Sequence, residues 1–149
     1  MHSSNRFDDQ ALVRPAQIDV YPPPSHGPPR PAVVAVHGEI DASNADEVGL
    51  AATALFDELV DVVVDLGAVS FIASRGLWIL IELPVLARHR GVACAVVASP
   101  AANRLLRIVG QHRPMWVFDT ADTAANAVAQ ASRTLEHLVP LRSPPAHCG

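Results

Sequence analysis

Short apolar runs alternate with longer amphipathic segments along the chain, and this alternation predicts strands and helices in turn. Consecutive apolar residues bounded by turn residues are typical of strands that lie buried in a sheet. A weaker alternation of polar and apolar residues at 17–21 predicts an edge strand. Buried strands are predicted at 32–36, 61–66, 93–98 and 115–118.

The segments between these strands carry the signals at which helices begin and bend. Asn44 with Glu47 three residues later predicts a capping box, and Ser99 before Pro100 predicts a serine cap. Pro84 predicts a kink, because an internal proline removes a backbone hydrogen bond. The predicted helices cover 44–59, 76–89, 101–109 and 120–138, and the first is expected to bury Val48, Ala51, Ala52, Leu55 and Leu59.

Apolar strands that alternate with helices predict an α/β fold, and a length of 149 residues predicts one domain. We expect a flexible N-terminus at 1–10, the domain at 11–138 and a flexible C-terminal tail at 139–149. Six prolines lie within residues 22–31, which are therefore predicted to form an extended loop. This loop is either a spacer between two strands or a proline-rich ligand for an SH3-like partner.

Charge and hydropathy narrow the classes of partner. The net charge is −4, and all eleven positive residues are scattered arginines, so no direct contact with nucleic acid is expected. The longest apolar stretch, 76–87, is interrupted by Glu82 and Pro84 and is shorter than the roughly 20 residues of a membrane span. The N-terminus carries no secretion signal, so a cytoplasmic protein is expected.

No recognisable spacing of residues indicates an enzyme, a metal site or a bound cofactor. Catalysis would require a nucleophile with a base, paired carboxylates or a phosphate-binding loop, and none is evident. The two cysteines and seven histidines are dispersed, and Cys94 is expected to be an inert thiol in the core. We therefore predict no catalytic residue, no metal ligand and no cofactor.

Two segments stand out from this background. The first is Gly38-Glu39-Ile40-Asp41, and the second is Asp65-Leu66-Gly67-Ala68-Val69-Ser70-Phe71-Ile72-Ala73-Ser74-Arg75-Gly76-Leu77. Together with the order of the elements, they resemble the STAS domain of bacterial anti-sigma factor antagonists, which has Gly-Glu-Leu-Asp and Asp-Leu-x-x-Val-x-Phe-Met-Asp-Ser-Ser-Gly-Leu at these places. The resemblance covers roughly residues 11–137. It implies a central mixed, mostly parallel sheet covered by about four helices.

The resemblance also implies a function for the loop that contains Ser74. In this family a kinase-type anti-sigma factor phosphorylates the serine at that place, and only the unphosphorylated antagonist holds the kinase away from its sigma factor. The residues expected to bind the partner are Asp41, Ala73, Ser74, Arg75 and Gly76. Ala73 and Arg75 depart from the family pattern, which has Asp and a second Ser or Thr there. A monomer or weak homodimer is expected.

Several alternatives remain open for these residues. Ser74 is either a phosphate acceptor or a plain helix cap, and Asp41 is either a docking residue or a solvated turn residue. Trp78 either packs in the core or anchors a partner. The alternatives to a phosphorylated antagonist are a ligand-sensing STAS module and a constitutive one that accepts no phosphate.

Overall fold

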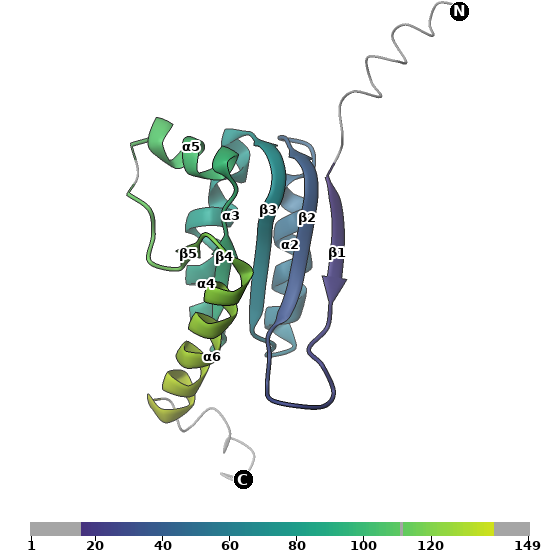
Figure 1. Ribbon diagram of the computed structural model, residues 1–149, viewed down its shortest axis with the longest axis vertical. Helices are drawn as coiled ribbons and strands as arrows, with labels where there is room; N and C mark the ends of the chain where they lie inside the picture. The colour runs from purple at the N-terminus through teal and green to yellow at the C-terminus, as the bar shows by residue number, and fades with distance from the viewer. Residues whose placement is uncertain (1–15, 111, 139–149) are drawn as a thin grey trace, which may run out of the picture.

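A five-stranded sheet in the order β1-β2-β3-β4-β5 forms the centre of the computed structural model, which describes residues 16–110 and 112–138, with the side chains of 134–138 excepted. The strand β1 is antiparallel to β2, and the other strands pair in parallel (Figure 1). The strands are β1 (Gln17–Tyr21), β2 (Ala32–Ile40), β3 (Val62–Ile72), β4 (Cys94–Val97) and β5 (Val117–Phe118). The predicted mixed, mostly parallel α/β sheet is confirmed.

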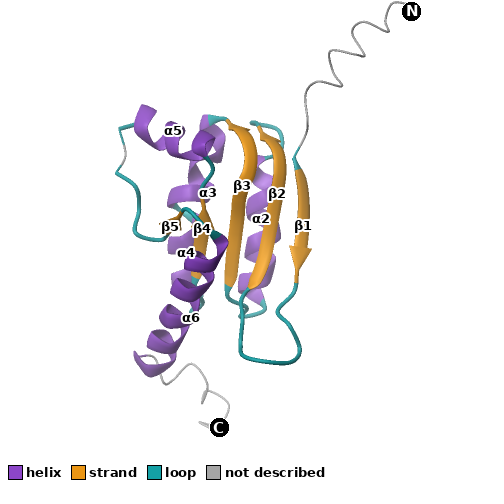
Figure 2. Cartoon of the chain, in the orientation of Figure 1, coloured by secondary structure: helices purple, strands orange, loops and turns teal. Residues whose placement is uncertain are grey.

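The crossovers between the parallel strands are helical. They are α2 (Ala45–Asp57), the 3₁₀ helix η1 (Ser74–Gly76) with α3 (Leu77–Ile81) and α4 (Leu83–His89), and α5 (Pro100–Ile108); α6 (Ala121–Leu138) ends the described chain. Figure 2 shows α2 behind the sheet and α6 in front of it. The side chains of β3 and β4 therefore alternate between two apolar clusters, a large one under α2–α5 and a small one under α6.

The strands β2 and β3 are longer than their apolar runs predicted. Predicted ends at Val36 and Leu66 are wrong, since the strands continue to Ile40 and Ile72. The pairing register of β2 with β3 shifts in two places, at Ala35/His37 and at Gly38/Glu39. Such irregularities let a strand continue through the polar and glycine residues that the sequence indicated as strand ends. They carry both strands on to the edge of the sheet where the site lies.

The helix ends agree with the sequence signals at Ser99 and at Pro84 but not at Leu59. The Ser99 hydroxyl accepts a hydrogen bond from the backbone N–H of Ala102 at 3.2 Å, as a serine cap should. The segment 76–89 divides at Glu82 into α3 and α4, with Pro84 in the first turn of α4. The prediction that Leu59 is buried is wrong: α2 ends at Asp57, and Leu59 lies beyond it in the left-handed region with φ 61° and is 57% exposed.

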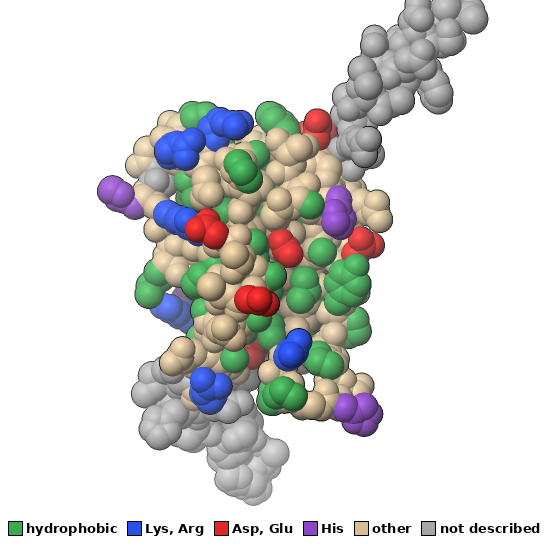
Figure 3. Space-filling model, viewed as in Figure 1, with side chains coloured by type: hydrophobic (Ala, Val, Ile, Leu, Met, Phe, Trp, Pro, Cys, Tyr) green, Lys and Arg blue, Asp and Glu red, His purple; other side chains and the backbone are tan. Residues whose placement is uncertain are grey.

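The remaining segments are positioned by these elements. The last strand covers only Val117–Phe118 instead of 115–118, and the Met115 side chain is exposed. Residues 22–31 form an exposed loop between β1 and β2, at the opposite end of the sheet from η1 (Figure 1). On the face that α6 crosses, acidic and basic side chains are interspersed (Figure 3). The predicted flexible ends, 1–10 and 139–149, lie outside the described residues.

Phe56 is the largest fully buried side chain among the described residues, so its removal tests the core. We expect Phe56→Ala to lower the free energy of unfolding by about 3–5 kcal/mol, because truncation leaves a cavity under α2. Urea denaturation followed by circular dichroism measures this. Leu50→Ala on the same helix is the control, since Leu50 is 66% exposed and should change stability by less than about 0.5 kcal/mol. Equal losses in the two variants would contradict this account of the core.

Candidate partner-docking site

The predicted site residues converge where β2 and β3 end. The two strands pair in parallel up to Ile40 and Ile72, so their carboxyl ends lie at the same edge of the sheet. The backbone N–H of Ala73 donates a hydrogen bond to the carbonyl of Ile40 at 2.8 Å. This bond fixes the segment after β3 against the segment after β2. Asp41 and Ser74, 33 residues apart in sequence, therefore belong to one surface region.

Asp41 organises the turn between β2 and α2. Its Oδ1 atom accepts hydrogen bonds from the Ser43 N–H at 2.9 Å, the Ser43 hydroxyl at 2.6 Å and the Asn44 N–H at 3.2 Å. The hydrogen bond from the Ser43 hydroxyl is the main reason that the pKa of Asp41 is lowered. All these bonds reach Oδ1, and no described residue bonds Oδ2. The side chain is thus structural and still has one carboxylate oxygen to offer a partner.

Asn44 does not form the predicted capping box. It stands at the N-cap of α2, but its side chain makes no capping hydrogen bond. Its Oδ1 atom accepts from the Asp41 N–H at 2.9 Å, and its Nδ2 group donates to the Glu39 carbonyl at 3.0 Å. The buried amide therefore ties the turn to the end of β2. Asn44 is a residue type that is common at N-caps, but its side chain makes these two contacts instead of a capping hydrogen bond.

Ser74 is exposed and is the first residue of η1. The N-cap of η1 is Ala73, in an extended conformation with φ −78° and ψ 164°, so the interpretation of Ser74 as the cap is wrong. The Ser74 hydroxyl makes no hydrogen bond with any residue in the described part of the chain. A hydroxyl without an internal partner is free to meet a second protein.

Arg75 is held by an acidic residue that the sequence analysis did not single out. Its Nη2 atom lies 3.1 Å and 3.0 Å from the two carboxylate oxygens of Asp46, in the first turn of α2. Both side chains are more than half exposed, so the pair adds little to stability. Its effect is positional, since it keeps the guanidinium over α2 beside Ser74. Residues 29 apart in sequence gave no local signal for this contact.

Two close approaches hold η1 and α3 in place. A Cβ atom on Gly76 would lie 2.6 Å from Cγ1 and 2.7 Å from Cδ1 of Ile72, so only glycine fits without movement. A Cβ atom on Gly49 would overlap the Trp78 ring, which means that the indole of α3 lies directly on the backbone of α2. Trp78 packs against the large apolar cluster, as the core interpretation expected. Gly76 therefore has a packing role within the predicted docking residues.

The described residues contain neither a group of metal-ligand side chains nor a helix that could span a membrane. In residues 16–110 and 112–138, no three His, Cys, Asp or Glu side chains are grouped as metal ligands would be. No helix in the described part of the chain has the length and apolarity that a membrane crossing requires.

Comparison with protein families decides the family. The model of the STAS domain matches residues 22–124, which include both of the segments that suggested the resemblance. The chain belongs to the STAS domain family. Within this STAS domain, the site described above lies on β2, α2, β3 and η1.

Solved structures that are similar to this STAS domain include two bacterial proteins. The first is an anti-sigma factor antagonist from Mycobacterium paratuberculosis, with a TM-score of 0.59 and 28% identity, covering 77% of this chain and 95% of that one. The second is a Thermotoga maritima protein with a TM-score of 0.48 and 22% identity, covering 65% of this chain and 87% of that one. The comparison with curated proteins found no match.

We expect Gly76→Ala to destabilise the STAS domain by about 1–3 kcal/mol, because the new methyl group overlaps the Ile72 side chain. Urea denaturation measures the loss. The matched test is a double-mutant cycle with Ile72→Ala, which removes the overlapping atoms. Ile72→Ala should cost less in the Gly76→Ala background than alone, and strictly additive losses would contradict the overlap.

Asp41 should stabilise its turn only while it is ionised. Its pKa in the folded protein lies below the ordinary value of 3.8, so the stabilisation is fully present above pH 3.8 and is lost as the pH falls through the folded-state pKa. The difference in free energy of unfolding between the wild type and Asp41→Ala should therefore be constant near neutral pH and shrink in acid. Thermal denaturation across pH measures it. Ser43→Ala removes the main cause of the lowered pKa and should move this loss to higher pH; an unchanged profile would refute the assignment.

Proposed function

We propose that this STAS domain, taken as residues 11–138, is an anti-sigma factor antagonist. It binds a kinase-type anti-sigma factor and thereby releases the sigma factor, and phosphorylation of Ser74 switches the binding off. The observation that carries the proposal is the exposed Ser74 hydroxyl, which bonds to no described residue and lies on one surface with Asp41 and Arg75. The 28% identical Mycobacterium paratuberculosis antagonist, almost all of which is covered, supports the same role.

The chemistry of the surface supports a charge switch. Phosphorylation adds about −1.5 to −2 charges and three strong acceptor oxygens. These would arise on the same surface as the Asp41 carboxylate, whose lowered pKa keeps it ionised. A partner surface that fits the neutral Ser74 hydroxyl would then face a concentrated negative charge. Like charges across an interface cost several kcal/mol of binding free energy. The protein acts in this proposal by docking in the cytoplasm as a monomer or weak homodimer, and not by catalysis or by contact with nucleic acid.

The two departures from the family pattern affect how the switch works. Ala73 supplies no carboxylate next to Ser74, so the local negative charge before phosphorylation is lower than the family pattern would give. Arg75 already contacts Asp46, and a phosphoryl group on Ser74 would compete with that carboxylate for the guanidinium. In this proposal the phosphorylated state therefore also changes the surface of α2 around Asp46.

The proposal is tested by binding measurements with the kinase-type anti-sigma factor of the same organism. We expect Ser74→Ala to bind like the wild type and Ser74→Glu to bind at least about tenfold more weakly, because the carboxylate mimics part of the phosphate charge. Calorimetry gives the affinities. Ser25→Glu is the matched control, since Ser25 is exposed in the 22–31 loop at the far end of the sheet.

Incubation of the complex with ATP, followed by mass spectrometry, tests the modification itself. Phosphate on Ser74 and release of the partner would support the full proposal. Normal binding by Ser74→Glu, with no phosphate on Ser74, would instead make this STAS domain a constitutive antagonist. Failure of the wild type to bind any such partner would refute the antagonist role.

A further inference from the structure

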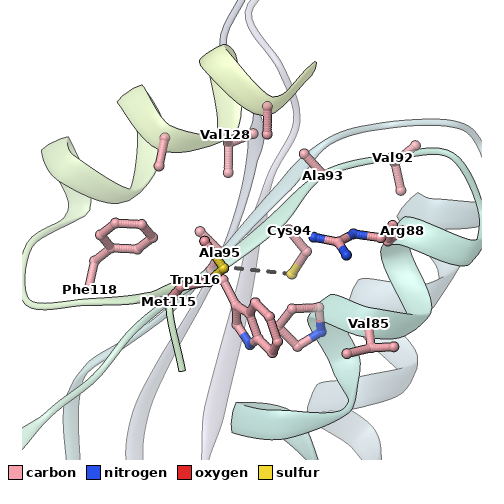
Figure 4. A pocket seen from close by; sticks show the side chains of 13 residues that line it. Val85, Arg88, Val92, Ala93, Cys94, Ala95, Met115, Trp116, Phe118 and Val128 are labelled. Carbon is pink, nitrogen blue, oxygen red and sulfur yellow. Dashed lines mark hydrogen bonds between the residues drawn. The ribbon is translucent and has the colours of Figure 1, made fainter. Parts of the chain in front are cut away.

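A concave site lies away from Ser74, between α4 and α6. It is a groove of about 590 Å³ over β4 and the segment that leads into β5 (Figure 4). This volume is in the usual range of small-molecule sites, about 300–1,000 Å³. Residues of α4 and α6 form its walls, and β4 forms its floor. The groove shares no lining residue with the docking site.

The lining of the groove is apolar except at one end. Val85 of α4 and Val128 of α6 face it from the walls, and Cys94 and Ala95 form part of the floor. Trp116 and Phe118 add aromatic surface, with Phe118 on the far side of the groove from α4 in Figure 4. An apolar surface of this shape favours an apolar body in a ligand.

Arg88 is the single charged residue among the described residues that line the groove. Figure 4 shows its side chain extending from α4 toward Cys94. Arg88 makes no ion pair or hydrogen bond with a residue of the described chain, whereas Arg90, two residues further on, pairs with Asp57. The guanidinium is thus available to an anion at one end of an apolar groove.

The other polar groups near this end do not neutralise Arg88. Burial raises the pKa of the Cys94 thiol, which therefore stays neutral at physiological pH. Asp61 lies close enough to act on Cys94, but its carboxylate accepts a hydrogen bond from the Ala93 N–H at 2.9 Å and does not line the groove. The groove therefore has one formal charge, and it is positive.

We propose that this groove binds a small amphipathic carboxylate of the fatty-acid type. The carboxylate pairs with the Arg88 guanidinium, and the acyl chain lies over Cys94 and Ala95 toward Phe118. Both parts of the ligand follow from the lining, since a guanidinium recognises a carboxylate by charge and paired N–H donors, while the apolar walls exclude a second polar group. The binding site is independent of the proposed antagonist function.

Calorimetry with the full chain and decanoate tests the proposal, with tryptophan fluorescence as a second readout because the Trp116 indole lines the groove. We expect decanoate to bind more tightly than 1-decanol, and decyltrimethylammonium to bind least. These three probes share an apolar chain and differ in charge. Equal binding of all three, or no binding of decanoate, would overturn the proposal.

Variants then place the ligand. Arg88→Ala should weaken decanoate binding by about tenfold or more and leave 1-decanol binding unchanged, whereas Arg107→Ala on α5 should alter neither. Ala131→Phe should block the groove from α6, and Asn126→Phe, on the same helix but outside the lining, is its control. Decanoate binding that is insensitive to both Arg88→Ala and Ala131→Phe would overturn the assignment. So would ultracentrifugation showing a dimer that Ala131→Phe abolishes, because a second copy would then occupy the groove.

Discussion

The parallel pairing of β2 with β3, carried past the apolar part of both strands, is the constraint on which the site depends. Two irregularities in register let the pairing continue to Ile40 and Ile72, and the bond from the Ala73 N–H to the Ile40 carbonyl closes it. Without this continuation, Asp41 and Ser74 would follow two separate strand ends at different heights. With it, the turn before α2 and the helix η1 become one surface.

Most of the fold could be predicted because its signals are local. Consecutive apolar residues marked the buried strands, and Ser99 and Pro84 marked a helix start and a helix break through backbone chemistry that depends only on near neighbours. The family could also be predicted, because it rests on two short segments at a fixed spacing. One error is local as well: Leu59 follows the helical period of α2, but the helix stops two residues earlier.

The site was harder to predict, because its contacts join distant residues. The family resemblance predicted the residues around Ser74. It did not predict the partner of Arg75, because Asp46 is an ordinary acidic residue in a first helical turn. The use of the Asn44 amide depends on the position of the Glu39 carbonyl, which follows from the irregular register of β2. The groove between α4 and α6 had no signal, because its lining comes from four elements that only the fold brings together.

The contact of the Trp78 ring with the backbone of Gly49 has a consequence for how this sequence can diverge. The space above Gly49 is filled by the indole, so a side chain there requires a smaller residue in place of Trp78. The two positions are 29 apart in sequence, yet a side chain at position 49 is possible only with a smaller residue at position 78. Relatives that keep glycine and tryptophan at these places should keep the same separation of α2 from α3. Relatives that carry a side chain at position 49 should carry a smaller residue at position 78, and their α2 and α3 should pack at a different distance.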